Sequence, residues 1–173
     1  MRAKLEAWEP SEFLKRHNPD VGLVMLKRAL TAGELATNPE IPTLAHVAEV
    51  YGDATAVVWL RNQLDAVDVV LGANAFGELA RHCAAQLIFA KYRDVNVGNL
   101  LQFFTRFRCG EYNEAVEYIG GVQKIMTALR LYMITRDDDA RRVMRERETE
   151  RAWREREAWR EKAISYEEYL AGK

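Results

Sequence analysis

The residues that most often carry enzyme chemistry are few in this chain and stand far apart. The three histidines are His17, His46 and His82, and none has a partner at the spacing of a metal site. His82 and Cys83 are adjacent, so on a helix their side chains point about 100° apart and cannot chelate one ion. The sequence therefore predicts no metal ion and no cofactor.

Nucleophiles and carboxylates form no catalytic set either. The only serines, Ser11 and Ser165, are better explained as helix N-caps than as nucleophiles. Cys83 falls on an apolar helical stripe and is expected to be a small core residue. Acidic residues three positions apart, such as Asp65 and Asp68, are typical of a solvated helix face unless further ligands join them. We therefore predict that the protein is not an enzyme and has no catalytic residue.

The strongest chemical candidate is the turn after the segment LLQFFTRF, residues 100–107. Arg106 and Arg108 precede Gly110 and Tyr112, which places two guanidinium groups near a phenol at a predicted helix end. Guanidinium groups bind carboxylates and phosphates readily, so Arg106, Arg108 and Tyr112 are a candidate anion-binding turn. The simpler interpretation is a core helix that ends in a glycine cap.

A candidate for nucleic-acid binding is segment 44–64, LAHVAEVYGDATAVVWLRNQL, which has the outline of a helix-turn-helix. In DNA readers of that type, the second helix begins with polar side chains that reach base edges. Here it would begin with Asp53, Ala54 and Thr55, which offer little to bases, and the carboxylate repels phosphate. Ordinary packing of two helices explains the segment better.

Helices must position these side chains, because apolar residues recur three or four positions apart along the chain. The predicted fold class is all-α: a compact helical bundle of about five helices with a long charged C-terminal helix or tail. One helix is expected within 21–34, and a small hairpin is conceivable only within 110–121. Expected N-caps are Ser11, Thr43, Asp53 and Asn74. Expected core positions are Val57, Leu60, Leu64, Val67, Leu71, Phe76, Leu79, Cys83, Leu87, Leu100, Phe103, Phe104, Phe107, Val122, Ile125, Met126, Leu129 and Met133.

The charge pattern divides the chain into a helical N-terminal arm at 1–42, a helical core domain at 43–135 and a charged C-terminal helix or tail at 136–173. Ten basic and nine acidic residues stand among the 27 positions of 136–162. As one helix, these would form a rod of roughly 40 Å. The tail is poor in apolar residues, so the core should survive its removal. The apolar residues of the tail are the candidate partner-binding set: Trp153, Trp159, Tyr166, Tyr169 and Leu170.

Composition limits the surroundings in which this chain is expected to work. With a formal net charge of −1, it has no general attraction to nucleic acid or to anionic lipid. No apolar run approaches the roughly 20 residues of a membrane span, and no apolar signal segment follows the first residues. The two cysteines form no C-x-x-C pair. We expect a cytoplasmic protein without a membrane partner.

Several motifs resemble those of an uncharacterised family of short helical proteins from intestinal bacteria and their phages or mobile elements. The resemblance covers about residues 43–170 and departs at Asn113, where the family has glycine. It implies relatives but no activity. The positions that carry it are Trp59, Leu64, Tyr92, Phe103, Phe104, Arg106, Phe107, Gly110 and Tyr112.

Two functions compete on these observations. The first is a non-enzymatic adaptor that binds a protein partner through its C-terminal tail, on a plan similar to that of phage loaders of the replicative helicase. A replication protein would then be the partner. The second is a helical nucleic-acid-binding protein that uses segment 44–64 or the basic residues at 106–108. The acidic residues of the tail nearly cancel its basic ones, which favours the first and predicts weak or no nucleic-acid binding.

Overall fold

The computed structural model of the chain describes residues 5–27 and 30–162. Within these residues the chain is all-α, as predicted; its only β pairing is an isolated bridge between Thr43 and Asn96. The helices outnumber the expected five. They are α2 (Pro10–Arg16), α3 (Pro19–Lys27), α4 (Ala32–Ala36), α5 (Leu44–Tyr51), α6 (Asp53–Leu71), α7 (Glu78–Lys91), α8 (Val97–Arg108) and α9 (Gly121–Lys162), with short 3-10 helices η1 (Gly72–Asn74) and η2 (Glu114–Val116).

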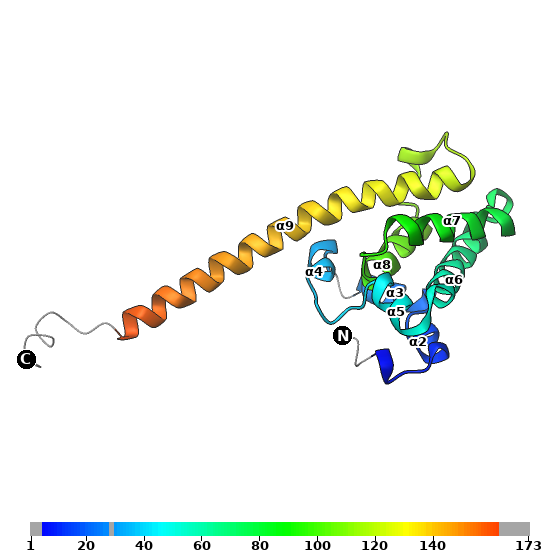
Figure 1. Ribbon diagram of the computed structural model, residues 1–173. Coiled ribbons are helices and arrows are strands. Elements are labelled where there is room, and N and C mark those ends of the chain that lie inside the picture. The colour runs from blue at the N-terminus through cyan, green and yellow to red at the C-terminus, as the bar shows by residue number, and fades with distance from the viewer. Residues whose placement is uncertain (1–4, 28–29, 163–173) are drawn as a thin grey trace, which may run out of the picture.

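Helix α8 lies within the body and packs against α3, α4, α6 and α9 (Figure 1). Every residue from 97 to 105 is buried, including the polar Asn99, Gln102 and Thr105. The predicted stripe of Leu100, Phe103, Phe104 and Phe107 is confirmed as core. The N-terminal arm shares this core, since Leu5 and Phe13 are also fully buried in it.

The end of α8 has the geometry that Gly110 predicts. Gly110 has a φ of 83°, and its N–H donates to the Phe107 carbonyl at 3.0 Å. The N–H of Glu111 donates to the Arg106 carbonyl at 3.2 Å, which completes a Schellman cap. Tyr112 then folds back, and its ring stacks on Phe107 with centroids 6.3 Å apart. Residues 110–121 form turns and η2, without a hairpin.

The helix starts are partly as expected. Thr43 caps α5, and its side chain accepts the N–H of His46, whose ring in turn contacts Thr43. Ser11 is not a cap, because Pro10 already occupies the first turn of α2 after Glu9.

Two other expected caps are also wrong. Asp53 is the first residue of α6, and the N-cap is Gly52, which alone separates α5 from α6. Asn74 lies in η1, and α7 is preceded by Gly77 instead. Gly52 and Gly77 both have positive φ, which glycine adopts without steric penalty.

The helix expected within 21–34 is two helices. Helix α3 begins at Pro19, where the side chain of Asn18 accepts the N–H groups of Asp20 and Val21. Helix α4 is a separate turn whose N-cap Thr31 forms a capping box with Glu34. Proline at a first turn and a Thr-x-x-Glu motif are both starting signals, and they outweigh the leucine spacing.

Helix α7 buries a different face from the one expected. Leu79, Cys83 and Leu87 were expected in the core, but all three are exposed, Leu79 by 77% and Leu87 by 49%. The buried face consists of Ala84, Ala85 and Ile88. Small alanines allow close approach to α6 and α9, the two helices that α7 packs against.

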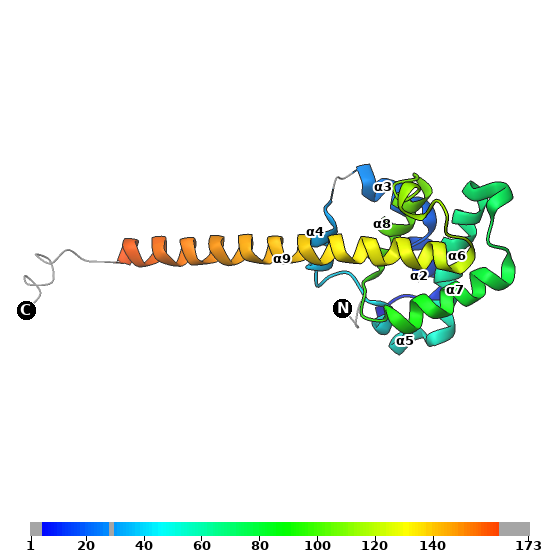
Figure 2. The ribbon, with the colours of Figure 1, turned by 90° about the horizontal axis from the view of Figure 1, so that it is seen from above.

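Helix α9 is continuous from Gly121 to Lys162, so the 135/136 division of the chain lies inside one helix (Figures 1 and 2). It crosses the body and then projects beyond it. Helix α4 lies directly against it; a Cβ added at Gly33 would stand 2.4 Å from the backbone carbon of Asp139.

Candidate partner-binding helix

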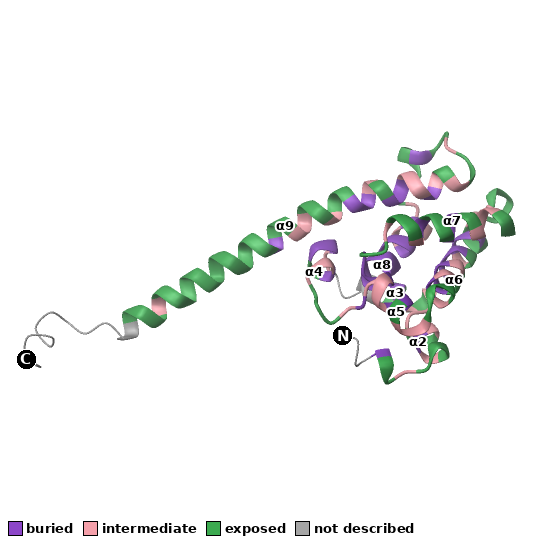
Figure 3. Cartoon of the chain, in the orientation of Figure 1, coloured by how far each residue is buried: buried purple, intermediate pink, exposed green. Residues whose placement is uncertain are grey.

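Helix α9 consists of a packed half and a projecting half. On the packed half, Ile125, Leu129 and Tyr132 are buried in the core, and Val143 is the last buried side chain among residues 121–160. From residue 144 to residue 160, every side chain but that of Glu157 is classed as exposed (Figure 3). The last link to the body among the described residues is a 3.3 Å hydrogen bond from Arg147 to the Thr37 carbonyl.

Ion pairs within the projecting half stabilise its helical structure. Arg151 pairs with Glu155 at 3.0 Å and Arg160 with Glu157 at 3.0 Å, and Arg154 pairs with Glu150. Each exposed pair contributes only a few tenths of a kcal/mol, and the three pairs together cover residues 150–160. The balanced charge of the tail therefore has a local role, namely to keep this segment helical without tertiary contacts.

Two tryptophans interrupt the charged surface. Trp153 is 61% exposed and Trp159 is 76% exposed. They are six residues apart, which places them about 120° apart around the helix. The other three members of the candidate set, Tyr166, Tyr169 and Leu170, lie outside the described residues.

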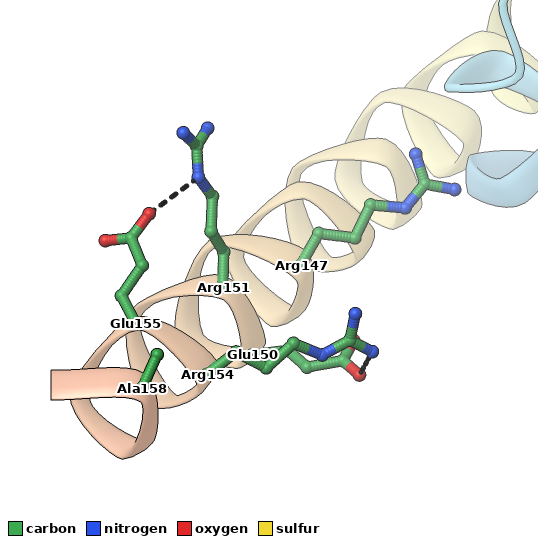
Figure 4. Close-up of a pocket in the computed structure, with 6 residues that line it drawn as sticks. All are labelled: Arg147, Glu150, Arg151, Arg154, Glu155 and Ala158. Atoms are coloured by element: carbon green, nitrogen blue, oxygen red, sulfur yellow. Dashed lines mark hydrogen bonds and ion pairs between the residues drawn. The ribbon is translucent and has the colours of Figure 1, made fainter. Parts of the chain in front are cut away.

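Shallow hollows lie along the same half. One, of about 420 Å³, is lined by Arg147, Glu150, Arg151, Arg154, Glu155 and Ala158 (Figure 4). Its side chains all rise from α9 itself, and no other helix closes it. A second hollow, of about 520 Å³, lies beside Trp153 and is lined by Arg142, Arg145, Glu146, Thr149 and Glu150. Both are open surfaces that a flat or helical partner can cover, without the enclosure that a small ligand needs.

The candidate anion-binding turn is already engaged within the chain. The Arg108 guanidinium donates to the Pro19 carbonyl at 2.7 Å, which ties the end of α8 to the start of α3. Arg106 lies 3.8 Å from the carboxylate of Glu111, and its positive charge lowers the pKa of the neighbouring Tyr112 phenol. Burial has the larger effect and raises the pKa of Tyr112 to about 12, so its phenol stays neutral well above neutral pH. Arg106 and Tyr112 are therefore neighbours, whereas Arg108 is directed to the start of α3, so the structure shows no contact that joins all three candidate residues.

A buried polar network that the sequence analysis missed positions α9 on the body. The Tyr132 hydroxyl donates to Gln102 at 2.9 Å and accepts from the Asn99 amide at 2.9 Å. The same amides reach the chain before and within α4, since Asn99 donates to the Ala32 carbonyl and Gln102 to the Leu30 carbonyl. The sequence feature that could have predicted this network is the presence of Asn99 and Gln102 among the apolar residues of α8.

The remaining chemical candidates are structural where they are described. Arg81 bridges Asp65 and the buried Asp68, whose carboxylate also accepts the Phe76 N–H at 2.8 Å. The His17 ring contacts the Phe13 carbonyl, and burial lowers the pKa of its imidazole. In residues 5–27 and 30–162, no three His, Cys, Asp or Glu side chains gather as a metal site would require. Over the same residues, each helix lacks either the length or the apolar character to cross a membrane.

Segment 44–64 forms two helices with one residue between them. The start of α6 offers Asp53 and Ala54 to solvent, while Trp59 and Leu60 are fully buried. The Trp59 indole donates to the His17 carbonyl at 2.7 Å, so the middle of α6 packs against the N-terminal arm. The exposed start of α6, which a DNA reader would use, therefore presents a carboxylate and small side chains that offer little to base edges.

Comparison of this chain with protein-family models, with curated proteins and with solved structures gives no match. The resemblance to helical proteins of intestinal bacteria therefore stays a hypothesis that rests on the motif residues alone. Any functional conclusion must come from the geometry of the chain itself.

Proposed function

We propose that this protein is a non-enzymatic adaptor that binds a protein partner through the projecting half of α9, residues 144–162. The proposal rests on the exposure of two tryptophans in the half of α9 that extends beyond the body. Trp153 is 61% exposed and Trp159 is 76% exposed. Large aromatic side chains provide much of the energy of protein interfaces, and a free chain gains nothing by exposing them.

The geometry limits the shape of the partner. Trp153 and Trp159 point about 120° apart, so a single flat surface cannot bury both. A groove or a pair of helices that grips two sides of α9 fits this arrangement, as in helix-in-groove recognition. Alternating acidic and basic side chains around the tryptophans would set the register of such a partner more than its affinity.

The adaptor plan also motivates the choice of partner class. A compact helical body with an arm for a second protein is the plan of phage helicase loaders, and on this analogy the partner is a replication protein. Nucleic-acid binding is the second candidate function. Arg108 donates to the Pro19 carbonyl, which holds its guanidinium against α3, and the carboxylate of Glu111 offsets the charge of Arg106.

The test is capture of partners from cell extract with the tagged full-length chain and with a Trp153→Ala/Trp159→Ala double variant. We expect the double variant to lose most of the captured protein, because both anchors are removed. Circular dichroism of the two proteins should be the same, since neither tryptophan touches the core.

A matched control is the Glu12→Ala/Arg16→Ala double variant, which removes one exposed ion pair from α2, outside the proposed binding surface, and leaves the net charge unchanged. It should capture the partner as the wild type does. Equal capture by the tryptophan variant and the wild type would show that the binding surface lies elsewhere on the chain.

A further inference from the structure

The sector of α9 that lies between the two exposed tryptophans carries positive charge only. At about 100° per residue, Trp153 and Trp159 mark the edges of a sector about 120° wide on the projecting half. None of the five glutamates among residues 142–160 falls within this sector, whereas four of the seven arginines do. Its members are all exposed and follow one another around the helix from Trp153 to Trp159 as Arg160, Arg142, Thr149, Arg156, Arg145 and Ala152.

Two arginines near the midline of this sector have no acidic partner. Within residues 5–27 and 30–162, neither Arg145 nor Arg156 lies within ion-pairing distance of a carboxylate. The Nε of Arg145 donates to the Arg141 carbonyl at 3.3 Å, which leaves the two terminal amino groups of its guanidinium unpaired. Both side chains are exposed, so their charge is directed to solvent.

The rest of the surface of this half of α9 neutralises itself. The glutamates outside the sector pair with arginines on the same side of the helix, as Figure 4 shows for two pairs, and the arginines at the Trp153 edge reach acids beyond that edge. The pairs are Arg151–Glu155, Arg154–Glu150, Arg142–Asp139 and Arg160–Glu157. The charge left for a partner is therefore concentrated between the two tryptophans.

We propose that the partner of α9 is a protein with an acidic groove, whose floor carries carboxylates that pair with Arg145 and Arg156 and whose two apolar walls cover Trp153 and Trp159. This inference rests on the proposed adaptor function and specifies the chemistry of the partner. A guanidinium group pairs with a carboxylate through two parallel hydrogen bonds. Arg145 and Arg156 are 11 residues apart. The carboxylates of the partner would therefore stand about 16 Å apart along the groove.

The hollow of about 520 Å³ beside Trp153 is where one wall of the groove would lie. Four of its lining residues belong to the sector, namely Arg142, Arg145, Thr149 and Trp153. Its other lining residues are glutamates beyond Trp153. An apolar side chain of the partner that enters this hollow meets the indole, while a neighbouring carboxylate reaches Arg145.

A second copy of this chain does not fit the sector. Packing of one sector against another about a two-fold axis would place arginines opposite arginines, without a carboxylate between them. Like charges that face each other across an interface disfavour that partner strongly. The charge pattern therefore indicates a different protein.

Nucleic acid fits less well, because the sector is narrow and its unpaired charges are few. Duplex DNA carries one negative charge per about 1.7 Å of its axis, hence about ten over the 16 Å between Arg145 and Arg156. Only these two unpaired arginines would face them. Glutamates also flank the sector about 20–40° beyond each tryptophan, Glu146 and Glu157 on one side and Glu148 and Glu155 on the other, and they repel phosphates.

The size of the sector sets the expected strength of the contact. Residues 142–160 span about 28 Å, and a third of the circumference of a helix gives on the order of 300 Å² per partner. Stable complexes bury about 800 Å² per partner, so this contact should be transient. Its strength should depend on charge and fall as salt screens the arginines.

The test is binding of the full chain to a fluorescent random copolymer of glutamate and tyrosine, an acidic polypeptide with apolar side chains. Anisotropy at about 50 mM salt, where screening is weak, measures it. We expect Arg145→Gln/Arg156→Gln to weaken binding about fivefold, because both unpaired cations are removed. Trp153→Ala/Trp159→Ala should weaken binding to the copolymer as well.

A matched control is Arg151→Gln/Arg154→Gln, which removes the same charge from the same helix outside the sector. It should weaken binding by less than about twofold, because any general attraction falls equally in the two arginine variants. Circular dichroism of the two variants should agree, since all four side chains are exposed.

Three results would overturn the inference: a wild type that does not bind the copolymer, equal weakening by the two arginine variants, or tighter binding to duplex DNA that is lost in Arg145→Gln/Arg156→Gln. The adaptor function is tested separately, by capture from extract with the tryptophan variant. If that variant loses its captured protein while both arginine variants bind the copolymer equally, the adaptor stands and the acidic groove does not. If it captures as the wild type does, the adaptor itself fails.

Discussion

Phe104 lies in the middle of α8 with 1% of its surface exposed, and its ring centroid is 5.2 Å from that of Phe103. We expect Phe104→Ala to lower the free energy of unfolding by about 3–5 kcal/mol, because the cavity it leaves cannot collapse within a packed helix. Urea denaturation followed by circular dichroism measures this change. The control is Tyr118→Ala, which truncates an aromatic residue that is 93% exposed. Equal midpoints for the two variants would mean that Phe104 is not packed.

Two tyrosines, the buried Tyr132 and the partly buried Tyr112, make the stability of the folded protein depend on pH in the alkaline range. Burial raises the pKa of the Tyr132 phenol well above the ordinary value and raises that of Tyr112 to about 12. The folded state therefore favours neutral phenols, and this contribution is complete below about pH 10, where unfolded tyrosines are neutral too. It is lost as the pH rises from 10 towards 12.

We expect Tyr132→Phe to reduce this alkaline loss of stability, because the ionising group is gone. At pH 7 the variant should be less stable than the wild type by about 1–3 kcal/mol, since Gln102 and Asn99 lose a buried partner. Urea midpoints between pH 7 and pH 11.5 measure both effects. Tyr118→Phe, at an exposed position, should follow the wild type. An unchanged pH slope in Tyr132→Phe would contradict this account.

The burial and capping roles of individual residues could be predicted where the sequence pattern of a single helix was sufficient. Phe103, Phe104 and Gly110 follow from the helical spacing and the glycine cap within residues 100–110, a stretch that needs no distant partner. Cys83 was misplaced because α7 has two apolar faces, and spacing alone cannot say which one meets the body. The Arg81–Asp68 pair joins residues 13 positions apart in two helices, so no local pattern announces it.

Among the elements, α4 depends on a contact that only glycine allows. A Cβ at Gly33 would stand 2.4–2.7 Å from backbone atoms of Asp139 and Ala140, and backbone cannot yield as a flexible side chain does. We expect Gly33→Ala to destabilise the protein by about 1–3 kcal/mol, the usual effect of overpacking. Thermal unfolding measures it. Gly120→Ala is the control, because no atom lies within 4 Å of its Cβ. A neutral Gly33→Ala would mean that α4 is not held against α9.

The elements themselves were only partly predictable. The long helix α9 could be foreseen in outline from its charge pairs, and two of these, Glu150 with Arg154 and Glu157 with Arg160, form as spaced. The packing of α4 against α9 could not be predicted, because Ala140 and Val143 are isolated apolar residues in a charged segment. The sequences of α4 and of this part of α9 each give only a weak local signal. The contact between them joins residues more than 100 positions apart.

For the whole molecule, net charge and local pairing argue against a nucleic-acid surface. We expect binding to DNA or RNA at physiological salt to be non-specific, with a dissociation constant of about 1 µM or weaker. Fluorescence anisotropy with several duplex and single-stranded sequences measures it, and Arg106→Ala/Arg108→Ala should change little. Nanomolar binding that discriminates between sequences would restore the helix-turn-helix hypothesis for 44–64.

The melting temperatures of truncated chains test where the body ends and the projecting arm of α9 begins. Truncation after Arg147 removes no side chain that is buried among those described, so we expect the melting temperature to change by less than about 2 °C. Truncation after Thr135 also removes Asp139, Ala140 and Val143, the surface on which α4 rests. The loss of this contact should lower stability by about 2–3 kcal/mol and the melting temperature by roughly 5–10 °C.

Thermal unfolding by circular dichroism distinguishes the two truncations, because both lose helix but only one loses packing. Fraying of the new helix end affects each to a similar degree, so the difference between them isolates residues 136–147. This segment then belongs to the body, and the arm that can bind a partner begins after Arg147. If the two truncated chains melt together, α4 gains no stability from α9, and the boundary at 135/136 suggested by the charge pattern is the right one.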